Sequence, residues 1–126
     1  MSAQIQEVLL KMRHGYIENL PQQLDNMETL VMQLNSKEDY LDCYETLYLA
    51  VHSLKGTAGT YGVQIITDIC HPFEDYLTAE LEGGCGASNQ QITTCLQFTH
   101  LLRKAHKLVA AGSESFPEIE ASLAAI

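Results

Sequence analysis

The chain has 126 residues, enough for one domain with its own core, and 46% of them are hydrophobic, so a disordered chain is not expected. Seven Lys and Arg against sixteen Asp and Glu give a net charge of −9. This balance argues against nucleic acid or an anionic membrane surface as a partner, because both need a basic patch, and it favours a protein with a basic rim.

The four cysteines form neither a C-x-x-C pair nor a zinc-type spacing, and the N-terminus lacks the basic head and apolar run of a secretory signal. No apolar run approaches the roughly 20 residues that cross a bilayer. We therefore expect a cytoplasmic protein with reduced thiols and no membrane association. A monomer is expected because no second strongly apolar face is evident. The C-terminal residues have no linker character, which favours a complete protein over a domain of a larger kinase.

Apolar residues recur at helical spacing along the chain, and no alternating stretch is long enough to predict a sheet. Residues 1–35 are predicted to be helical on both sides of Pro21, which marks either a kink or the first turn of a second helix. The core helices, residues 36–111, follow as segments near 40–60, 63–81 and 89–111. A short terminal helix occupies residues 115–126.

The breaks between these helices carry recognisable signals. Gly62 is predicted to end the helix before it, residues 82–87 form a glycine-rich loop, and Ser88 is placed to cap the next helix. Pro72 falls inside a predicted helix, where it removes a backbone hydrogen bond and is expected to bend the helix near Asp68.

These segments predict an all-α fold, an up-and-down antiparallel four-helix bundle with an additional N-terminal helix as a lid and a short C-terminal helix. Short loops make consecutive helices antiparallel neighbours, so the helices on either side of Gly62 should form a hairpin. His52 lies ten residues before Gly62, whereas His71 and Glu74 lie nine and twelve residues after it. The hairpin is therefore expected to bring His71 and Glu74 towards His52.

The stretch VHSLKGTAGTYG, residues 51–62, is the most informative part of the sequence. On a helix, Lys55, Gly56 and Gly59 all lie within about 60° of His52, on a different side from the apolar residues. A glycine inside a helix costs roughly 1 kcal/mol. Two glycines beside an exposed histidine therefore indicate that another molecule approaches this backbone closely.

This pattern resembles the signature of histidine phosphotransfer (HPt) domains of two-component phosphorelays, H-x-x-K-G-x-x-x-x-x-G with small residues interleaved. The spacing of the downstream histidine and glutamate is most similar to the phosphotransfer domains of chemotaxis histidine kinases. The resemblance implies that residues 1–126 are a single HPt domain. It is carried by His52, Lys55, Gly56, Ala58, Gly59 and Gly62, and then by Val63, Ile66, Cys70, His71 and Glu74.

An imidazole is a good phosphoryl acceptor when one ring nitrogen is free and a hydrogen bond holds the other. His52 is the predicted phosphoacceptor, Glu74 the carboxylate that orients its ring, and Lys55 the cation that stabilises the phosphoryl oxygens. His71 is a further candidate for support. The sequence contains no Walker loop, kinase glycine loop or Mg²⁺-binding acidic cluster. We therefore expect a phosphocarrier without cofactor or kinase activity of its own, with ATP and Mg²⁺ on its partners.

The resemblance implies two kinds of partner, a histidine kinase or hybrid kinase and the receiver domain of a response regulator. His52 would accept the phosphoryl group from the kinase or from a receiver aspartate and relay it to a receiver. The partners are expected to dock around His52 on Glu45, Tyr48, Gly56, Gly59, Thr60 and Gln64.

Two other functions compete with this interpretation. The chain could be a docking module that binds and sequesters receivers without phosphoryl transfer, although such a surface needs no His52–Lys55 pair. It could also be a metal-binding bundle that uses Cys70, His71 and Glu74 with another histidine. The Glu-x-x-His pairs of di-iron bundles are absent from the sequence, which disfavours that alternative.

Overall fold

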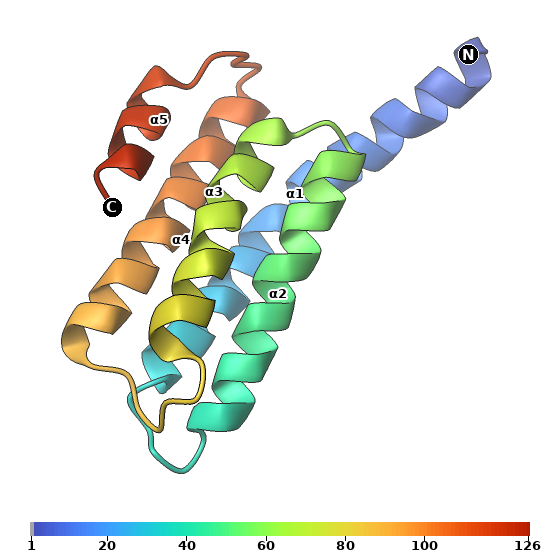
Figure 1. The fold of residues 1–126 in the computed structure, drawn as a ribbon. Helices are drawn as coiled ribbons and strands as arrows, with labels where there is room; N and C mark the ends of the chain where they lie inside the picture. The colour runs from blue at the N-terminus through green and yellow to red at the C-terminus, as the bar shows by residue number, and fades with distance from the viewer. Residues whose placement is uncertain (1) are drawn as a thin grey trace.

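A computed structural model of the chain describes residues 2–126 and shows a bundle of helices, with no strand in that range. The prediction of an all-α bundle is confirmed. Four long elements run antiparallel to their neighbours in chain order, and a fifth helix packs against the last of them (Figure 1). The elements are α1 (Ala3–Gln33), α2 (Tyr40–Thr60), α3 (Gln64–Tyr76), η1 (Leu77–Leu81), α4 (Asn89–Ala110) and α5 (Pro117–Ala124).

One continuous helix of 31 residues runs through Pro21, so of the two alternatives left open by the sequence, the start of a second helix at Pro21 is wrong. Pro21 lies inside α1 and leaves the carbonyl of Ile17, four residues earlier, without its helical donor. His106 of α4 supplies that donor, because its Nε2 lies 2.9 Å from the Ile17 oxygen. A histidine of the neighbouring helix thus satisfies the carbonyl that the proline frees, and the helix continues.

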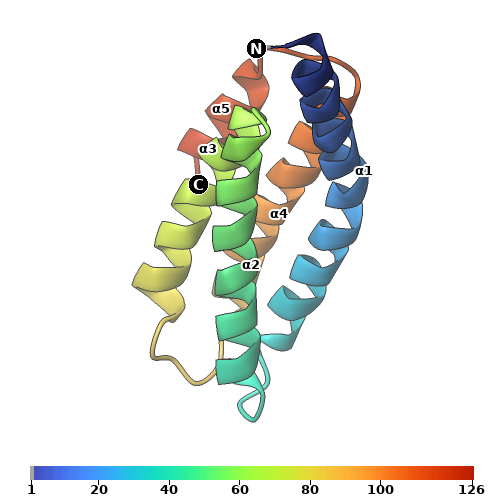
Figure 2. The same ribbon diagram turned by 90° about the vertical axis from the view of Figure 1, so that its right-hand side faces the viewer.

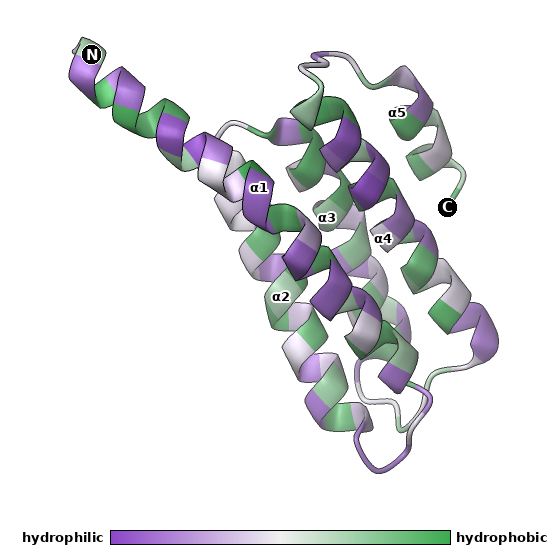
Figure 3. Cartoon of the chain, turned by 180° about the vertical axis from the view of Figure 1, so that it is seen from behind, coloured by the Kyte–Doolittle hydropathy of each residue, from purple (hydrophilic) through white to green (hydrophobic). Residues whose placement is uncertain are grey.

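The predicted N-terminal lid is instead an extension of α1. Residues 2–12 are exposed, and the first buried side chain of α1 is Tyr16. The extension projects past the end of α2 into open space (Figures 1 and 2). Seen from behind, apolar residues continue along it (Figure 3). The exposed apolar side chains on it are Ile5, Val8, Leu9, Leu10 and Met12.

A single apolar core joins all the helices. Each helix has one apolar face, and that face must be buried against another helix. Ile119 attaches α5 to this core, with Phe116 and Leu123 partly buried beside it. The largest fully buried side chains are Phe73, Leu20, Leu24, Met27, Leu34, Leu47, Leu54, Ile66, Ile69, Leu77, Leu81 and Leu102.

The turn between α2 and α3 fixes the hairpin that carries the site. Gly62 has φ 73°, a conformation that suits glycine. The N–H of Val63 donates to the oxygen of Ala58 at 2.8 Å, and the N–H of Gly62 donates to that of Gly59 at 3.2 Å. This pair of bonds is a Schellman motif, so the predicted role of Gly62 as a helix terminator is confirmed. Ser88 caps the start of α4 as predicted, and the structure shows that its cap is a full capping box.

The third predicted helix, residues 63–81, changes type near its end. Pro72 lies inside α3 without ending it, and the last turn, η1, is a π-helix. A π-turn fits one extra residue into the helix, and such turns are frequent near functional sites. Leu77 and Leu81 are both buried, and the hydroxyl of Tyr40 donates to the Leu81 oxygen.

Candidate functional site

His52 lies on the solvent-facing side of α2, and 58% of its side chain is exposed. The residues of α2 that face the core are a separate set, which includes Val51 and Leu54 on either side of it in sequence. The imidazole is therefore carried by a well-packed helix and is accessible to a large partner. A side chain on a rigid helix is held more precisely than one on a loop.

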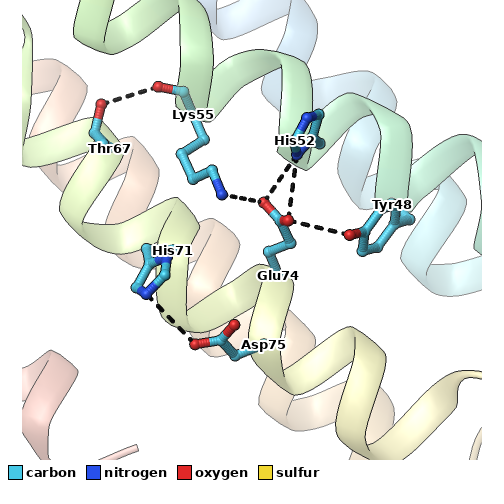
Figure 4. Close-up of polar contacts among 7 residues, drawn as sticks. All are labelled: Tyr48, His52, Lys55, Thr67, His71, Glu74 and Asp75. Carbon is cyan, nitrogen blue, oxygen red and sulfur yellow. Dashed lines mark hydrogen bonds and ion pairs between the residues drawn. The ribbon is translucent and has the colours of Figure 1, made fainter.

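Glu74 reaches His52 from α3 across the hairpin (Figure 4). Nδ1 of His52 lies 3.2 Å from Oε1 of Glu74 and 3.3 Å from Oε2. An ionised carboxylate can only accept hydrogen bonds, so Nδ1 carries the ring proton and Nε2 has the free lone pair. No hydrogen bond to Nε2 is found among residues 2–126.

Lys55, one turn after His52, is bound to the same carboxylate. Its Nζ lies 2.8 Å from Oε2 of Glu74, and 25% of its side chain is exposed. Thr67 of α3 donates to the backbone oxygen of Lys55 at 3.0 Å. This bond ties the two helices together beside the site and fixes the turn of α2 that carries the lysine.

Tyr48, one turn before His52, makes a third contact to the carboxylate. Its hydroxyl donates to Oε1 of Glu74 at 3.1 Å. Its ring is nearly parallel to the imidazole, with centroids 6.2 Å apart and an angle of 7° between the planes. The sequence places Tyr48 on the rim of the docking surface, but its contact with Glu74 follows only from the register of the hairpin.

Opposing effects set the charge of Glu74. Burial raises the pKa of its carboxyl, but the hydrogen bonds from Lys55, His52 and Tyr48 outweigh burial and hold the pKa below its ordinary value. The hydrogen bond to Glu74 also raises the pKa of Lys55 above its ordinary value. Glu74 is therefore a carboxylate and Lys55 an ammonium group at neutral pH.

His71 is not part of this cluster. Its Nε2 lies 3.6 Å from the carboxylate of Asp75, and both side chains are largely exposed. Figure 4 shows His71 on the outer side of α3, turned away from His52. The hairpin therefore brings Glu74 to His52 but leaves His71, the other residue expected there, outside hydrogen-bond reach.

The predicted docking residues differ little in their exposure. Glu45, Gly56, Gly59, Thr60 and Gln64 are all exposed, whereas Tyr48 is half-buried. A Cβ at Gly56 would meet no atom within 4 Å, and one at Gly59 would meet only Thr67 Oγ1 at 3.7 Å. Neither glycine is therefore required by packing within this chain.

Two contacts of the site could not be predicted from the sequence. They are the hydrogen bond from Thr67 to the backbone of Lys55 and the hydrogen bond from the Tyr48 hydroxyl to Glu74. Thr67 precedes Glu74 by seven residues, a spacing that places both on one face of α3. That spacing points to a contact of Thr67 with the site only when it is already known that this face of α3 packs against α2.

Two kinds of feature are not found in the part of the chain that the structure describes. Residues 2–126 contain no group of three His, Cys, Asp or Glu side chains arranged to hold a metal ion. None of the helices in that range has the length and apolar character that crossing a membrane demands.

A protein-family model described as "Hpt domain" matches residues 11–125. No solved structure matches the chain significantly.

Proposed function

The chain belongs to the Hpt domain family, and on that premise we propose that it carries a phosphoryl group on Nε2 of His52. Hpt domains serve histidine phosphotransfer in two-component phosphorelays. One observation carries the assignment to His52: an exposed imidazole has its Nδ1 bound to Glu74, so Nε2 is left as the nucleophile. The other nitrogen of the ring is held as the reaction needs.

In the proposed reaction, the lone pair of Nε2 attacks the phosphorus of an aspartyl phosphate. The N–P bond forms as the P–O bond to the leaving carboxylate breaks. The ring becomes positively charged, and the Glu74 carboxylate at Nδ1 stabilises that charge. The ammonium of Lys55 has further N–H donors beyond the one on Glu74, and these can reach phosphoryl oxygens on the exposed side.

We infer two partners, the receiver domain of a response regulator and a histidine or hybrid kinase. These partners would supply ATP and Mg²⁺. The spacing of His71 and Glu74 favours a chemotaxis-type kinase as donor. The four cysteines are free thiols, which supports the reducing cytoplasm as the location. We expect the protein to act as a monomer.

The surface around His52 suits a receiver in shape. Gly56 and Gly59 leave the backbone of α2 bare beside the imidazole, so the rim of a receiver active site can come close enough for in-line transfer. Glu45, Tyr48, Thr60 and Gln64 surround this bare strip. An acidic chain favours a receiver surface with basic groups at its edge.

The test is to incubate the protein with a ³²P-labelled phosphorylated receiver and with a cognate kinase and ATP. We expect a label that is stable in base and labile in acid, and its complete loss in His52→Gln. His14→Gln, which changes an exposed histidine on the α1 extension, should keep the label. Label retained by His52→Gln would overturn the assignment, and tight receiver binding without any label would favour the docking-module alternative.

A further inference from the structure

We propose that Tyr48 is a positioning residue of the phosphoacceptor, holding the Glu74 carboxylate through its hydroxyl and the His52 ring through its aromatic face. The inference rests on the proposed function of His52. It gives Tyr48 a role inside the site, in place of the rim position that the sequence indicates.

The hydroxyl contact is the first support. Oε1 of Glu74 accepts from Tyr48 at 3.1 Å and from Nδ1 of His52 at 3.2 Å, while Oε2 accepts from Lys55 at 2.8 Å. The three donors come from successive turns of α2, so they clamp the carboxylate from one side of the hairpin (Figure 4). A carboxylate with only the histidine and lysine as donors could rotate, and the imidazole would turn with it.

The aromatic contact is the second support. Tyr40, Tyr44, Tyr48 and His52 follow one another at four-residue spacing, and each pair of neighbouring rings has centroids 6.2 Å apart. Such separations are typical of offset aromatic pairs. The far end of this row is anchored, because Tyr40 is buried and its hydroxyl donates to the Leu81 oxygen. The row therefore gives the exposed imidazole a supported neighbour on one face.

The charges around Glu74 make Tyr48 an effective donor. Its hydrogen bond to Glu74 raises the pKa of the Tyr48 hydroxyl, so it stays protonated at neutral pH. In return this bond helps to lower the pKa of Glu74. The other groups that face the carboxylate are His52 and Lys55 on α2 and Cys70 on its own helix, where burial raises the pKa of the thiol to about 12 and keeps it neutral.

A role in positioning differs from a role in packing or in partner contact by its effect on the His52 ring itself. The Tyr48 hydroxyl helps to hold the Glu74 carboxylate against Nδ1 of His52. Loss of that hydroxyl should loosen the carboxylate, so the ring proton is no longer fixed on Nδ1 and fewer rings present a free Nε2.

The experiment compares Tyr48→Phe with Tyr44→Phe, which removes a hydroxyl from the same row without touching Glu74. The phosphoryl donor is phosphoramidate, a small molecule whose P–N bond breaks with release of ammonia as the N–P bond to His52 forms. At one fixed pH, we expect the phosphorylation of Tyr48→Phe to be slowed by up to about tenfold. Tyr44→Phe should keep the wild-type rate.

A second readout needs no phosphorylation. The ¹⁵N chemical shifts of the His52 ring should report a proton fixed on Nδ1 in the wild type and in Tyr44→Phe, but a mixture of tautomers in Tyr48→Phe. Tyr48→Leu, which removes the ring as well, should be affected more strongly. Wild-type ring signals and the wild-type rate of phosphorylation in Tyr48→Phe would overturn the proposal. If the wild type takes up no ³²P label from a phosphorylated receiver or a kinase, the proposed function fails. The ring signals still decide the role of Tyr48 in that case.

Discussion

The charge state of Glu74 links the site to the stability of the fold. Its pKa lies below the ordinary value of 4.5 because bonds from Lys55, His52 and Tyr48 outweigh the effect of burial. A carboxyl whose pKa is lower in the folded state stabilises the fold above its unfolded pKa. This stabilisation is lost as the pH falls through the folded value.

We therefore expect Glu74→Gln to melt at a lower temperature than the wild type at pH 7, with a difference that shrinks below about pH 4.5. Circular dichroism melts at several pH values measure this directly. Asp75→Asn, which changes an exposed carboxylate on the same helix, is the matched control. A difference for Glu74→Gln that persists unchanged at about pH 3 would contradict the ionised hydrogen-bonded carboxylate.

Gly56 and Gly59 are not needed for packing within the chain, but they are expected to matter for docking of a partner. An added Cβ finds space at both positions, and alanine favours a helix over glycine by roughly 1 kcal/mol. We expect Gly56→Ala and Gly59→Ala to raise the free energy of unfolding by about 0.5–1 kcal/mol while slowing transfer from a phosphorylated receiver. Labelling by phosphoramidate, which needs no close protein contact, should be unchanged. Receiver transfer at the wild-type rate in both variants would show that the bare strip is not a docking surface.

For single residues, the sequence could predict which side chains lie on one side of α2, because a helix has a fixed period. The spacing alone could not place Glu74 nearer to His52 than His71, and the preference for Glu74 came from the chemistry of a carboxylate and from the family resemblance. The two are three residues apart on α3, about 60° around the helix, and only the packing of α3 on α2 decides which of them faces His52. The structure turns Glu74 inward and pairs His71 with Asp75.

Among the elements, α1 shows why helix boundaries at proline are hard to predict. Pro21 is a helix breaker by local rules, yet α1 runs through it because His106 donates to the carbonyl of Ile17. That donor lies 89 residues away in sequence. The same limit applies to η1, since no local pattern distinguishes a π-turn from the α-helix that the sequence predicts at residues 77–81.

The compensation at Pro21 predicts an energetic coupling between α1 and α4. We expect His106→Leu to cost about 1–2 kcal/mol, because it leaves the Ile17 carbonyl without a donor. In a Pro21→Ala background the backbone N–H at position 21 can take over, so the same change should cost less. Urea unfolding of the two single variants and the double variant measures the coupling. Costs that add to within about 0.5 kcal/mol would mean that His106 does not replace the missing N–H.

For the molecule as a whole, α1 is built in two parts with different environments. From Tyr16 onwards it contributes to the common core with Leu20, Leu24, Met27 and Val31, whereas residues 2–12 are exposed. The family match begins at residue 11, close to the point where burial begins. The exposed part is helical because it continues a helix that the bundle already holds in place.

This division predicts that the first turns of α1 can be removed without loss of the fold. A chain that begins at Leu9 loses Ile5 and Val8, both more than half exposed, and should melt within a few degrees of the full chain and still accept phosphate on His52. A chain that begins at Pro21 also loses the burial of Tyr16 and Leu20 and the Ile17 carbonyl. At about 1.5–3 kcal/mol for each large buried side chain, it should lose several kcal/mol. Calorimetry of the three chains decides the matter, because equal destabilisation by both truncations would mean that the exposed turns of α1 do support the bundle.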